Sequence, residues 1–270
     1  MTVANLKDVL KADRAIAGLV VLGWEDARAY VEAADETGIP IILQAGPGAR
    51  KYTPVPILGK IFRHLAEQAR VPIVCHIDHA TTLHECIEGI ESGFTSVMID
   101  GSNLPIDENI ELTRSVVEVA RRANVSVEGE VGQVGYVYGA VSAMTSPEEA
   151  SRFDREGGAD ALAISIGNVH LNTEKTSSID WTALRAIEAV TNLPLVLHGG
   201  SGIPFDERAK LAHESRIAKF NFGTELRMAF GKALRKSLKD QPDSFDRIAL
   251  LSPTIAALRD ETIHVIKNIY

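Results

Sequence analysis

Eight short runs of apolar, largely β-branched residues recur along this chain of 270 residues and constrain its fold most strongly. Between them lie segments with apolar residues at helical spacing. The segment from Pro105 to Ala123, for example, carries Ile110, Val116 and Val117 on one face. Near-continuous apolar strands are expected where helices cover both faces of a parallel sheet. The predicted strands are Ile16–Leu22, Pro40–Ala45, Pro72–Asp78, Ser96–Asp100, Ser126–Gly132, Ala161–Gly167, Leu193–His198 and Ile217–Phe222.

Eight strand–helix units with no linker or low-complexity segment between them predict a TIM (β/α)8 barrel. This barrel would form a single domain over residues 1–270. A doubly wound open sheet is the alternative. Such sheets often carry a Gly-x-Gly-x-x-Gly sequence after the first strand, where this chain reads Val20-Val21-Leu22-Gly23-Trp24-Glu25. The segment Met1–Arg14 is expected to form a short helix.

Charge and hydropathy argue against several classes of partner. The net charge of −8 at pH 7 would repel nucleic acid and anionic membranes. No apolar run reaches the roughly 20 residues of a membrane span, and Met1–Arg14 lacks the apolar core of a signal peptide. Cys75 and Cys86 fall in strand and helix patterns, so we expect reduced thiols. We therefore predict a cytoplasmic protein that binds neither nucleic acid nor membrane.

Histidines stand at the ends of three predicted strands. The third strand ends in Cys75-His76-Ile77-Asp78-His79, His170 follows the sixth strand, and His198 follows the seventh. In a barrel the carboxyl ends of the strands lie on one rim, where the chemistry of this fold takes place. Neutral imidazole is a favoured zinc ligand, and three protein ligands with an open position are typical of catalytic zinc. The pattern predicts a metal site at His79, His170 and His198; the alternative is that each histidine bonds to backbone.

Carboxylates occupy two further strands. Glu128 and Glu130 are two residues apart in the fifth strand and therefore face the same side. Two inward carboxylates need a reason such as a nearby cation. Asp100 ends the fourth strand, where helix capping and a functional role are both open.

Glycine-containing loops follow the last two strands. The seventh strand leads into His198-Gly199-Gly200-Ser201-Gly202, and the eighth into Asn221-Phe222-Gly223-Thr224. Barrels commonly bind phosphate in these two loops, where glycines let backbone amides approach the oxygens. The sequence therefore predicts a phosphate site, with a simple tight turn as the alternative for the glycines after His198.

Assembled, these segments resemble the class II, zinc-dependent ketose-bisphosphate aldolases, a family that includes fructose- and tagatose-bisphosphate aldolases. The resemblance covers nearly the whole chain. It is carried by His76-Ile77-Asp78-His79, Ser96-Val97-Met98-Ile99-Asp100-Gly101-Ser102, Val125-Ser126-Val127-Glu128-Gly129-Glu130-Val131-Gly132, Ile166-Gly167-Asn168-Val169-His170, Leu197-His198-Gly199-Gly200-Ser201-Gly202 and Lys219-Phe220-Asn221-Phe222-Gly223-Thr224-Glu225. It implies reversible retro-aldol cleavage of a phosphorylated ketose into a dihydroxyacetone-phosphate-type triose and an aldehyde.

The resemblance also implies roles for single residues. Three histidines, His79, His170 and His198, would hold one Zn²⁺ per chain, with Glu130 near the ion. Asp78 would handle the proton on the C4 hydroxyl, and Asn221 would orient the enediolate. The residues expected to hold the phosphate are Gly199, Gly200, Ser201, Gly223 and Thr224. A monovalent cation and a homodimer or higher homo-oligomer are further implications.

Three positions depart from the family's pattern. The family usually carries a loop glutamate after the fifth strand that exchanges the proton at C3, and here Tyr138 stands at about that place. Tyr138 is therefore predicted either to share in proton transfer or to cover the pocket with its ring. The glycine usual after His170 is Leu171, and the Phe-Asn pair usual after the first strand is Leu19-Val20. We expect an intact zinc centre with an altered proton relay and distal pocket.

Two other functions remain open at this stage. A metal-dependent hydrolase would also use strand-end histidines, but it would place a His-x-His on the first strand, which here ends in Val20-Val21-Leu22-Gly23. A barrel that binds a metal and a phosphorylated ligand without turnover is the non-enzymatic alternative, suggested by the missing loop glutamate. An assay for zinc-dependent aldol cleavage separates the three functions.

Overall fold

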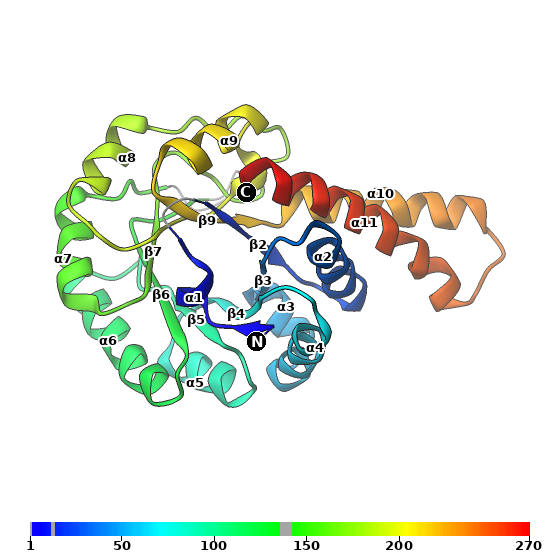
Figure 1. Cartoon of the computed structure of the whole chain (residues 1–270), viewed down its shortest axis with the longest axis horizontal. Coiled ribbons are helices and arrows are strands. Elements are labelled where there is room, and N and C mark those ends of the chain that lie inside the picture. Colours follow the sequence, from blue (N-terminus) through cyan, green and yellow to red (C-terminus); the bar gives the residue numbers. More distant parts are fainter. Residues whose placement is uncertain (1, 12–13, 136–141) are drawn as a thin grey trace.

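Eight parallel strands close into a barrel with helices around it in the computed structural model of the chain, which describes residues 2–11, 14–135 and 142–270 (Figure 1). The barrel strands are β2 (Ile16–Val20), β3 (Ile41–Ala45), β4 (Ile73–Ala80), β5 (Ser96–Ile99), β6 (Ser126–Val131), β7 (Ala161–Ile164), β8 (Leu195–Leu197) and β9 (Ile217–Phe222). Closure follows because β9 pairs with β2 and β4 pairs with β5. The predicted TIM barrel is confirmed, and the open doubly wound sheet is wrong.

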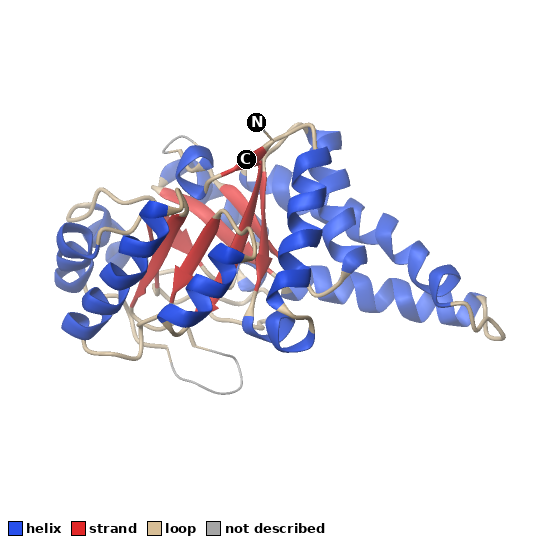
Figure 2. Cartoon of the chain, turned by 90° about the horizontal axis from the view of Figure 1, so that it is seen from below, coloured by secondary structure: helices blue, strands red, loops and turns tan. Residues whose placement is uncertain are grey.

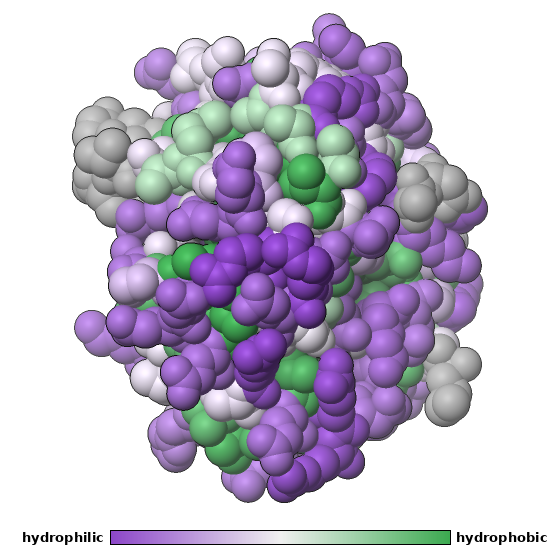
Figure 3. Space-filling view, turned by 90° about the vertical axis from the view of Figure 1, so that its left-hand side faces the viewer, coloured by the Kyte–Doolittle hydropathy of each residue, from purple (hydrophilic) through white to green (hydrophobic). Residues whose placement is uncertain are grey.

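Helices cover the outside of the barrel, as the amphipathic segments predict. They are α2 (Trp24–Thr37), α4 (Val55–Gln68), α5 (Leu83–Glu91), α6 (Ile106–Arg122), α7 (Pro147–Gly157), α8 (Trp181–Glu188) and α9 (Phe205–Glu214). The short helix α3 (Pro47–Tyr52) follows the carboxyl end of β3. Local sequence fixes their ends. Ser146 caps α7 by accepting a hydrogen bond from the Glu149 amide, and Gly158 ends the helix in the left-handed conformation. The face of the molecule over α6, α7 and α8 is mainly hydrophilic, with scattered apolar residues (Figure 3).

The N-terminal segment closes the barrel at its amino end. The single short helix expected over residues 1–14 is only partly right, because Val3–Ala4 form a strand, β1, that pairs with the start of β4. The helix itself, α1 (Leu6–Val9), has four residues. Its Leu6 and Val9 join a cluster inside the barrel that also includes Ile42, Val74 and Met98. This plug leaves the carboxyl ends of the strands as the open end.

The C-terminal helices form an arm that projects from the barrel. The two helices, α10 (Thr224–Asp240) and α11 (Arg247–Ile269), pack along each other and extend well beyond the strands (Figures 1 and 2). The far end of α11 returns to the barrel, where Leu258 and Ile266 are buried. In the described part of the chain, every helix is too short or too polar to cross a lipid bilayer.

Candidate metal centre and active site

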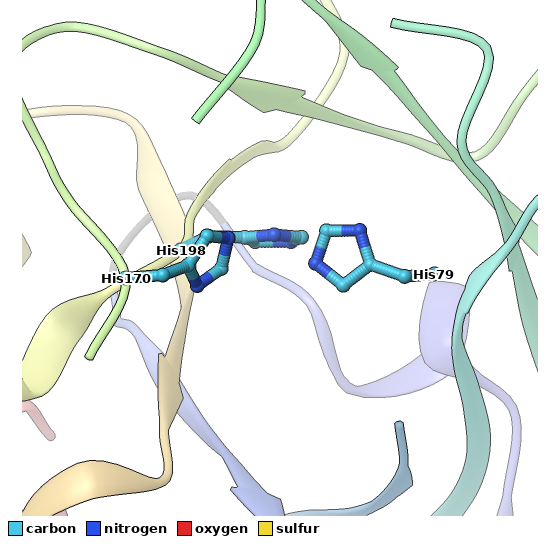
Figure 4. A group of neighbouring side chains, drawn as sticks. All are labelled: His79, His170 and His198. Carbon is cyan, nitrogen blue, oxygen red and sulfur yellow. The ribbon is translucent and has the colours of Figure 1, made fainter. Parts of the chain in front are cut away.

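Three imidazole rings converge at the open end of the barrel. His79 lies near the end of β4, His198 directly follows β8, and His170 lies in the segment after β7. The ring centroids are 4.6 Å apart for His79 and His198, 5.4 Å for His79 and His170, and 5.7 Å for His170 and His198 (Figure 4). One nitrogen of each ring lies within 4.8 Å of those of the other two. This group has the spacing that a metal ion requires.

Carboxylates fix the orientation of two of these rings. The Nδ1 atom of His79 lies 2.8 Å from Asp100 Oδ2, and the Nε2 atom of His198 lies 3.2 Å from Glu128 Oε1. The opposite nitrogens, His79 Nε2 and His198 Nδ1, are buried and have no hydrogen-bond partner in the described structure. A carboxylate on one ring nitrogen with the other nitrogen unpartnered is the arrangement found around metal-bound histidine. These residues therefore fit a zinc ion, for which nitrogen donors in a three-ligand set are suitable.

The protonation preferences of the three rings differ because their surroundings differ. Burial lowers the pKa of His198 well below its ordinary value and that of His170 to about 4, so both rings are neutral and able to bind a metal. Burial also opposes the charged form of His79, but Asp78, Asp100 and Glu130 outweigh it and raise its pKa to about 10. His79 is thus the ring around which negative charge gathers.

Glu130 stands beside this centre. Its Oε2 atom lies 3.8 Å from His79 Nδ1 and 3.8 Å from His198 Nδ1, and it is buried without a hydrogen-bond partner among the residues described. Burial and the neighbouring Asp100 raise the pKa of Glu130 to about 8. His79, Asp100 and Glu130 form a second group with metal-binding spacing. Asp100 also accepts hydrogen bonds from the amide and hydroxyl of Ser102, which lies in the turn before α6. The residue that precedes α6 is Pro105, so Asp100 does not cap this helix.

An irregularity in β4 brings Asp78 to the same side as His79. Regular alternation would send neighbouring side chains to opposite faces of a strand. Here Ile77 pairs with Val97 and Ala80 with Ile99, so two residues of β4 oppose one residue of β5. Asp78 and His79 consequently line one cavity. The Oδ1 atom of Asp78 accepts hydrogen bonds from Gln44 Nε2 at 2.9 Å and from Asn221 Nδ2 at 3.3 Å.

The cavity has a volume of about 270 Å³, and the two predicted glycine loops form one of its walls. Lining residues from these loops are Gly199, Ser201, Gly202, Asn221, Gly223 and Thr224. Gly199 has a φ of 68°, and a Cβ atom there would lie 2.4 Å from the Val169 carbonyl oxygen. Gly200 does not belong to the described lining; a Cβ atom on it would lie 2.9 Å from the ring of Phe222. Thr224 begins α10, so the positive end of that helix adjoins this wall.

Residues 2–270 match the model of the class II fructose-bisphosphate aldolase family. The chain belongs to this family. It is 34% identical to the 6-phospho-5-dehydro-2-deoxy-D-gluconate aldolase of Bacillus licheniformis, with 99% of this chain and 95% of that protein covered. It is 35% identical to the D-tagatose-1,6-bisphosphate aldolase subunit GatY of Klebsiella oxytoca, with 95% of this chain and 94% of that protein covered. The crystal structure of the YdjI aldolase of Escherichia coli K12 superposes with a TM-score of 0.83 at 27% identity, with 99% of this chain and 97% of that chain covered.

The protein is therefore an aldolase, and hence a lyase. Neither the hydrolase nor the non-enzymatic barrel is favoured.

Much of the remaining lining of this aldolase's cavity is apolar. It includes Val20, Leu22, Pro47, Ala49 and Leu171. Leu171 is 49% exposed and has a φ of 58°, a conformation that favours the glycine expected there by resemblance. Arg227, in the first turn of α10, is the single Lys or Arg of the described lining. Nothing in the sequence pattern distinguishes it from other arginines in helices. Tyr138 lies outside the described residues.

A buried polar network supports the aldolase's centre from within the barrel. The Nζ atom of Lys219 donates to Glu128 Oε2 at 2.6 Å and lies 3.5 Å from His76 Nε2, and His76 Nδ1 lies 2.8 Å from Ser96 Oγ. All four side chains are fully buried. Through Glu128 this network reaches His198, so His76 contributes to the support of the centre.

Proposed function

We propose that this class II aldolase uses one zinc ion per chain, held by His79, His170 and His198, to cleave a phosphorylated ketose. The products would be a dihydroxyacetone-phosphate-type triose and an aldehyde. One observation carries the proposal: three imidazoles converge while two of their buried nitrogens, His79 Nε2 and His198 Nδ1, lack a partner within the described structure. Bare buried nitrogens are costly unless something binds them. The proposed ligand set leaves a fourth position for substrate.

A zinc ion held there would polarise the ketose carbonyl and stabilise the negative charge that develops on it as the C3–C4 bond breaks. Asp78 is the proposed base. Its Oδ1 atom is held by Gln44 and Asn221, so the carboxylate is fixed in the cavity before substrate arrives. Accepting the proton of the C4 hydroxyl lets that oxygen form the aldehyde carbonyl. The electron pair of the C3–C4 bond then passes to the triose half, which Asn221 would orient.

A proton must then be delivered to C3 of the triose half. Tyr138 remains our proposal for this step, with a purely covering role as the alternative. Glu128 and Glu130, which both lie beside His198, are the other carboxylates that could deliver this proton. Because Glu128 is already hydrogen-bonded to Lys219 and His198, Glu130 is the stronger candidate for the proton donor to C3 if Tyr138 only covers the pocket.

The phosphate of the triose half would lie against Gly199, Gly200, Ser201, Gly223 and Thr224, where backbone amides and the start of α10 favour an anion. A monovalent cation near Leu171 is also part of the proposal. The substrate is a sugar phosphate. A second anionic group, if the ketose has one, would meet Arg227, because the cavity lining offers no other Lys or Arg among the described residues.

The assembly proposed for the enzyme is a homodimer of chains that each form one domain over residues 1–270. Phe245 is 99% exposed and Ile248 is 75% exposed at the tip of the arm. A groove of about 770 Å³ begins at the root of the arm and runs along α10 as far as Gln241; it is partly lined by Met228, Ala229, Ala233, Pro253 and Ala257. An apolar tip and an apolar groove on one chain are complementary surfaces for a second copy. A cytoplasmic location stays a prediction.

Removal and return of the metal tests the proposed function. Treatment with a strong chelator should abolish release of dihydroxyacetone phosphate from a panel of ketose mono- and bisphosphates, and added Zn²⁺ should restore it. His198→Ala should lose most of the bound zinc as well as activity, whereas His213→Ala, at an exposed position in α9, should keep both. Full activity in the metal-free enzyme, or full zinc content in His198→Ala, would refute the proposal.

A further inference from the structure

The end of β4 holds an unfavourable backbone conformation at the residue proposed to bind zinc. His79 has a φ of 51°, in the left-handed region that costs a non-glycine residue about 1 kcal/mol or more. Its neighbour Asp78 belongs to the same bulge, where two residues of β4 stand against one of β5. Such a conformation persists only where surrounding contacts determine it. The question is which contacts do so here.

Arg50 makes two contacts to the bulge and a third that anchors its guanidinium to β3. Its guanidinium donates from Nη1 to the carbonyl oxygens of Ala45 at 2.7 Å and Asp78 at 2.5 Å, and from Nη2 to that of His79 at 3.1 Å. The side chain comes from α3 and is only 8% exposed. One planar group thus ties the carboxyl end of β3 to both residues of the β4 bulge.

We propose that Arg50 is a positioning residue that holds the β4 bulge, so that Asp78 and His79 enter the cavity together. This inference rests on the proposed function only for the roles of Asp78 and His79. Arg50 is not part of the described cavity lining, so it acts through the two residues whose carbonyls it binds.

The chemistry of the side chain suits this role. A guanidinium presents several N–H donors in one plane and bonds several acceptors at fixed angles, whereas a lysine ammonium is a compact point charge. Glu85 is the nearest paired carboxylate, with its Oε1 atom 3.9 Å from Arg50 Nη2, beyond hydrogen-bond distance. The strong contacts of Arg50 are therefore to backbone.

Arg216 is a matched control within the same chain. Its guanidinium donates to three carbonyl oxygens, those of Glu188 at 3.1 Å, Thr191 at 2.6 Å and Leu193 at 3.2 Å. These residues precede β8 and β9, at the amino end of the barrel, away from the histidines. Arg216→Met removes the same kind of three-carbonyl clamp without touching the site.

The test compares Arg50→Met, Arg50→Lys and Arg216→Met with the wild-type holoenzyme. Zinc affinity is measured by competition with a chromophoric chelator, and kcat and KM are measured on one ketose phosphate. We expect Arg50→Met to bind zinc about 10-fold more weakly, the lower end of the losses caused by disturbing the support of a metal ligand. Its kcat should fall about 10- to 100-fold with KM nearly unchanged, because Asp78 is misplaced. Arg50→Lys should show most of both losses, and Arg216→Met should unfold at lower temperature but keep zinc affinity and kcat.

Three outcomes would refute the positioning role of Arg50. The first is wild-type zinc affinity and kcat in Arg50→Met, and the second is an equal loss of zinc affinity in Arg216→Met. The third is wild-type zinc affinity and kcat in Arg50→Lys, which would assign the effect to charge. If Arg50→Met does not fold, Arg50→Gln carries the same comparison. Zinc binding is measured without substrate. A wild-type enzyme that binds zinc but cleaves no ketose would therefore refute the proposed function. The zinc affinities of the variants would still show whether Arg50 positions the β4 bulge.

Discussion

At the scale of single residues, cleavage is expected to depend most directly on Asp78. Asp78→Asn keeps the size of the side chain but cannot accept the C4 hydroxyl proton, so kcat should fall about 10²- to 10⁴-fold while zinc content stays at one ion per chain. Steady-state kinetics and metal analysis on the same sample check this. If kcat of the variant stays within a few-fold of the wild-type value, Asp78 only orients its neighbours Gln44 and Asn221.

Tyr138 carries a prediction that rests on sequence alone. A phenol, with a reference pKa of about 10, is a poor base at neutral pH unless a nearby cation lowers its pKa. Tyr138→Phe removes the hydroxyl and keeps the ring. If the tyrosine moves the proton, exchange of the C3 hydrogen with deuterated solvent should slow together with cleavage, and Tyr136→Phe should change neither. Unchanged exchange in Tyr138→Phe would leave the tyrosine as a cover and assign the proton to Glu130, Glu128 or water.

The two cysteines should behave as buried hydrophobic residues. Burial raises the pKa of both Cys75 and Cys86 to about 12, so neither forms a thiolate in the folded enzyme at pH 8 to 9. Their thiols should react with an alkylating reagent only after unfolding in denaturant. In the unfolded chain a thiol has a pKa of about 8.5. The contribution of the two protonated thiols to the free energy of unfolding is therefore complete below that pH and is lost as the pH rises toward 12. Rapid labelling of the native enzyme at pH 8 would contradict this.

The sequence was sufficient to predict that the three histidines converge, because each follows an apolar strand and barrel topology places strand ends on one rim. Gln44, Arg50 and Arg227 could not be found in the same way. Gln44 sits inside a buried strand, and the two arginines lie in helices where a charged residue is ordinary. Their contacts to Asp78, to the β4 carbonyls and to the cavity exist only once distant segments are packed together.

At the scale of elements, all eight barrel strands were predictable because burial on both faces demands continuous apolar runs. Two local features were not. The N-terminal segment was expected to be helical throughout, but Val3 and Ala4 pair with β4, a tertiary contact that local pattern does not reveal. The β4 bulge was also hidden, since strict alternation would place Asp78 and His79 on opposite faces. The resemblance to the family implied a role for both Asp78 and His79. The register shift between β4 and β5 explains why both side chains line the same cavity.

At the scale of the whole molecule, the barrel alone does not account for the C-terminal segment from Thr224 onward. The α1 plug closes the amino end and the histidines occupy the other, yet α10 and α11 extend sideways as an arm with little of its tip buried (Figures 1 and 2). Of the large apolar residues of α11, Leu258 and Ile266 are buried, and Ile255 and Ile263 pack partly on the core. Ile248 is the one that remains well exposed, beside Phe245. An isolated arm with apolar residues at its tip is expected to be covered in solution.

The enzyme should therefore have twice the 29.2 kDa mass of one chain when measured at micromolar concentration by sedimentation or light scattering. Replacing Phe245 and Ile248 together by Ser removes the apolar tip and should shift the mass toward that of one chain. The barrel should stay folded, because neither side chain contacts its core. Ile57→Ser is the control, since Ile57 is 51% exposed on α4, away from the arm, and its loss should leave the mass unchanged. The groove at the root of the arm shares Ser201 and Thr224 with the catalytic cavity, so dissociation should also weaken substrate binding. A wild-type enzyme that is monomeric at this concentration would show that the arm is not a dimer contact.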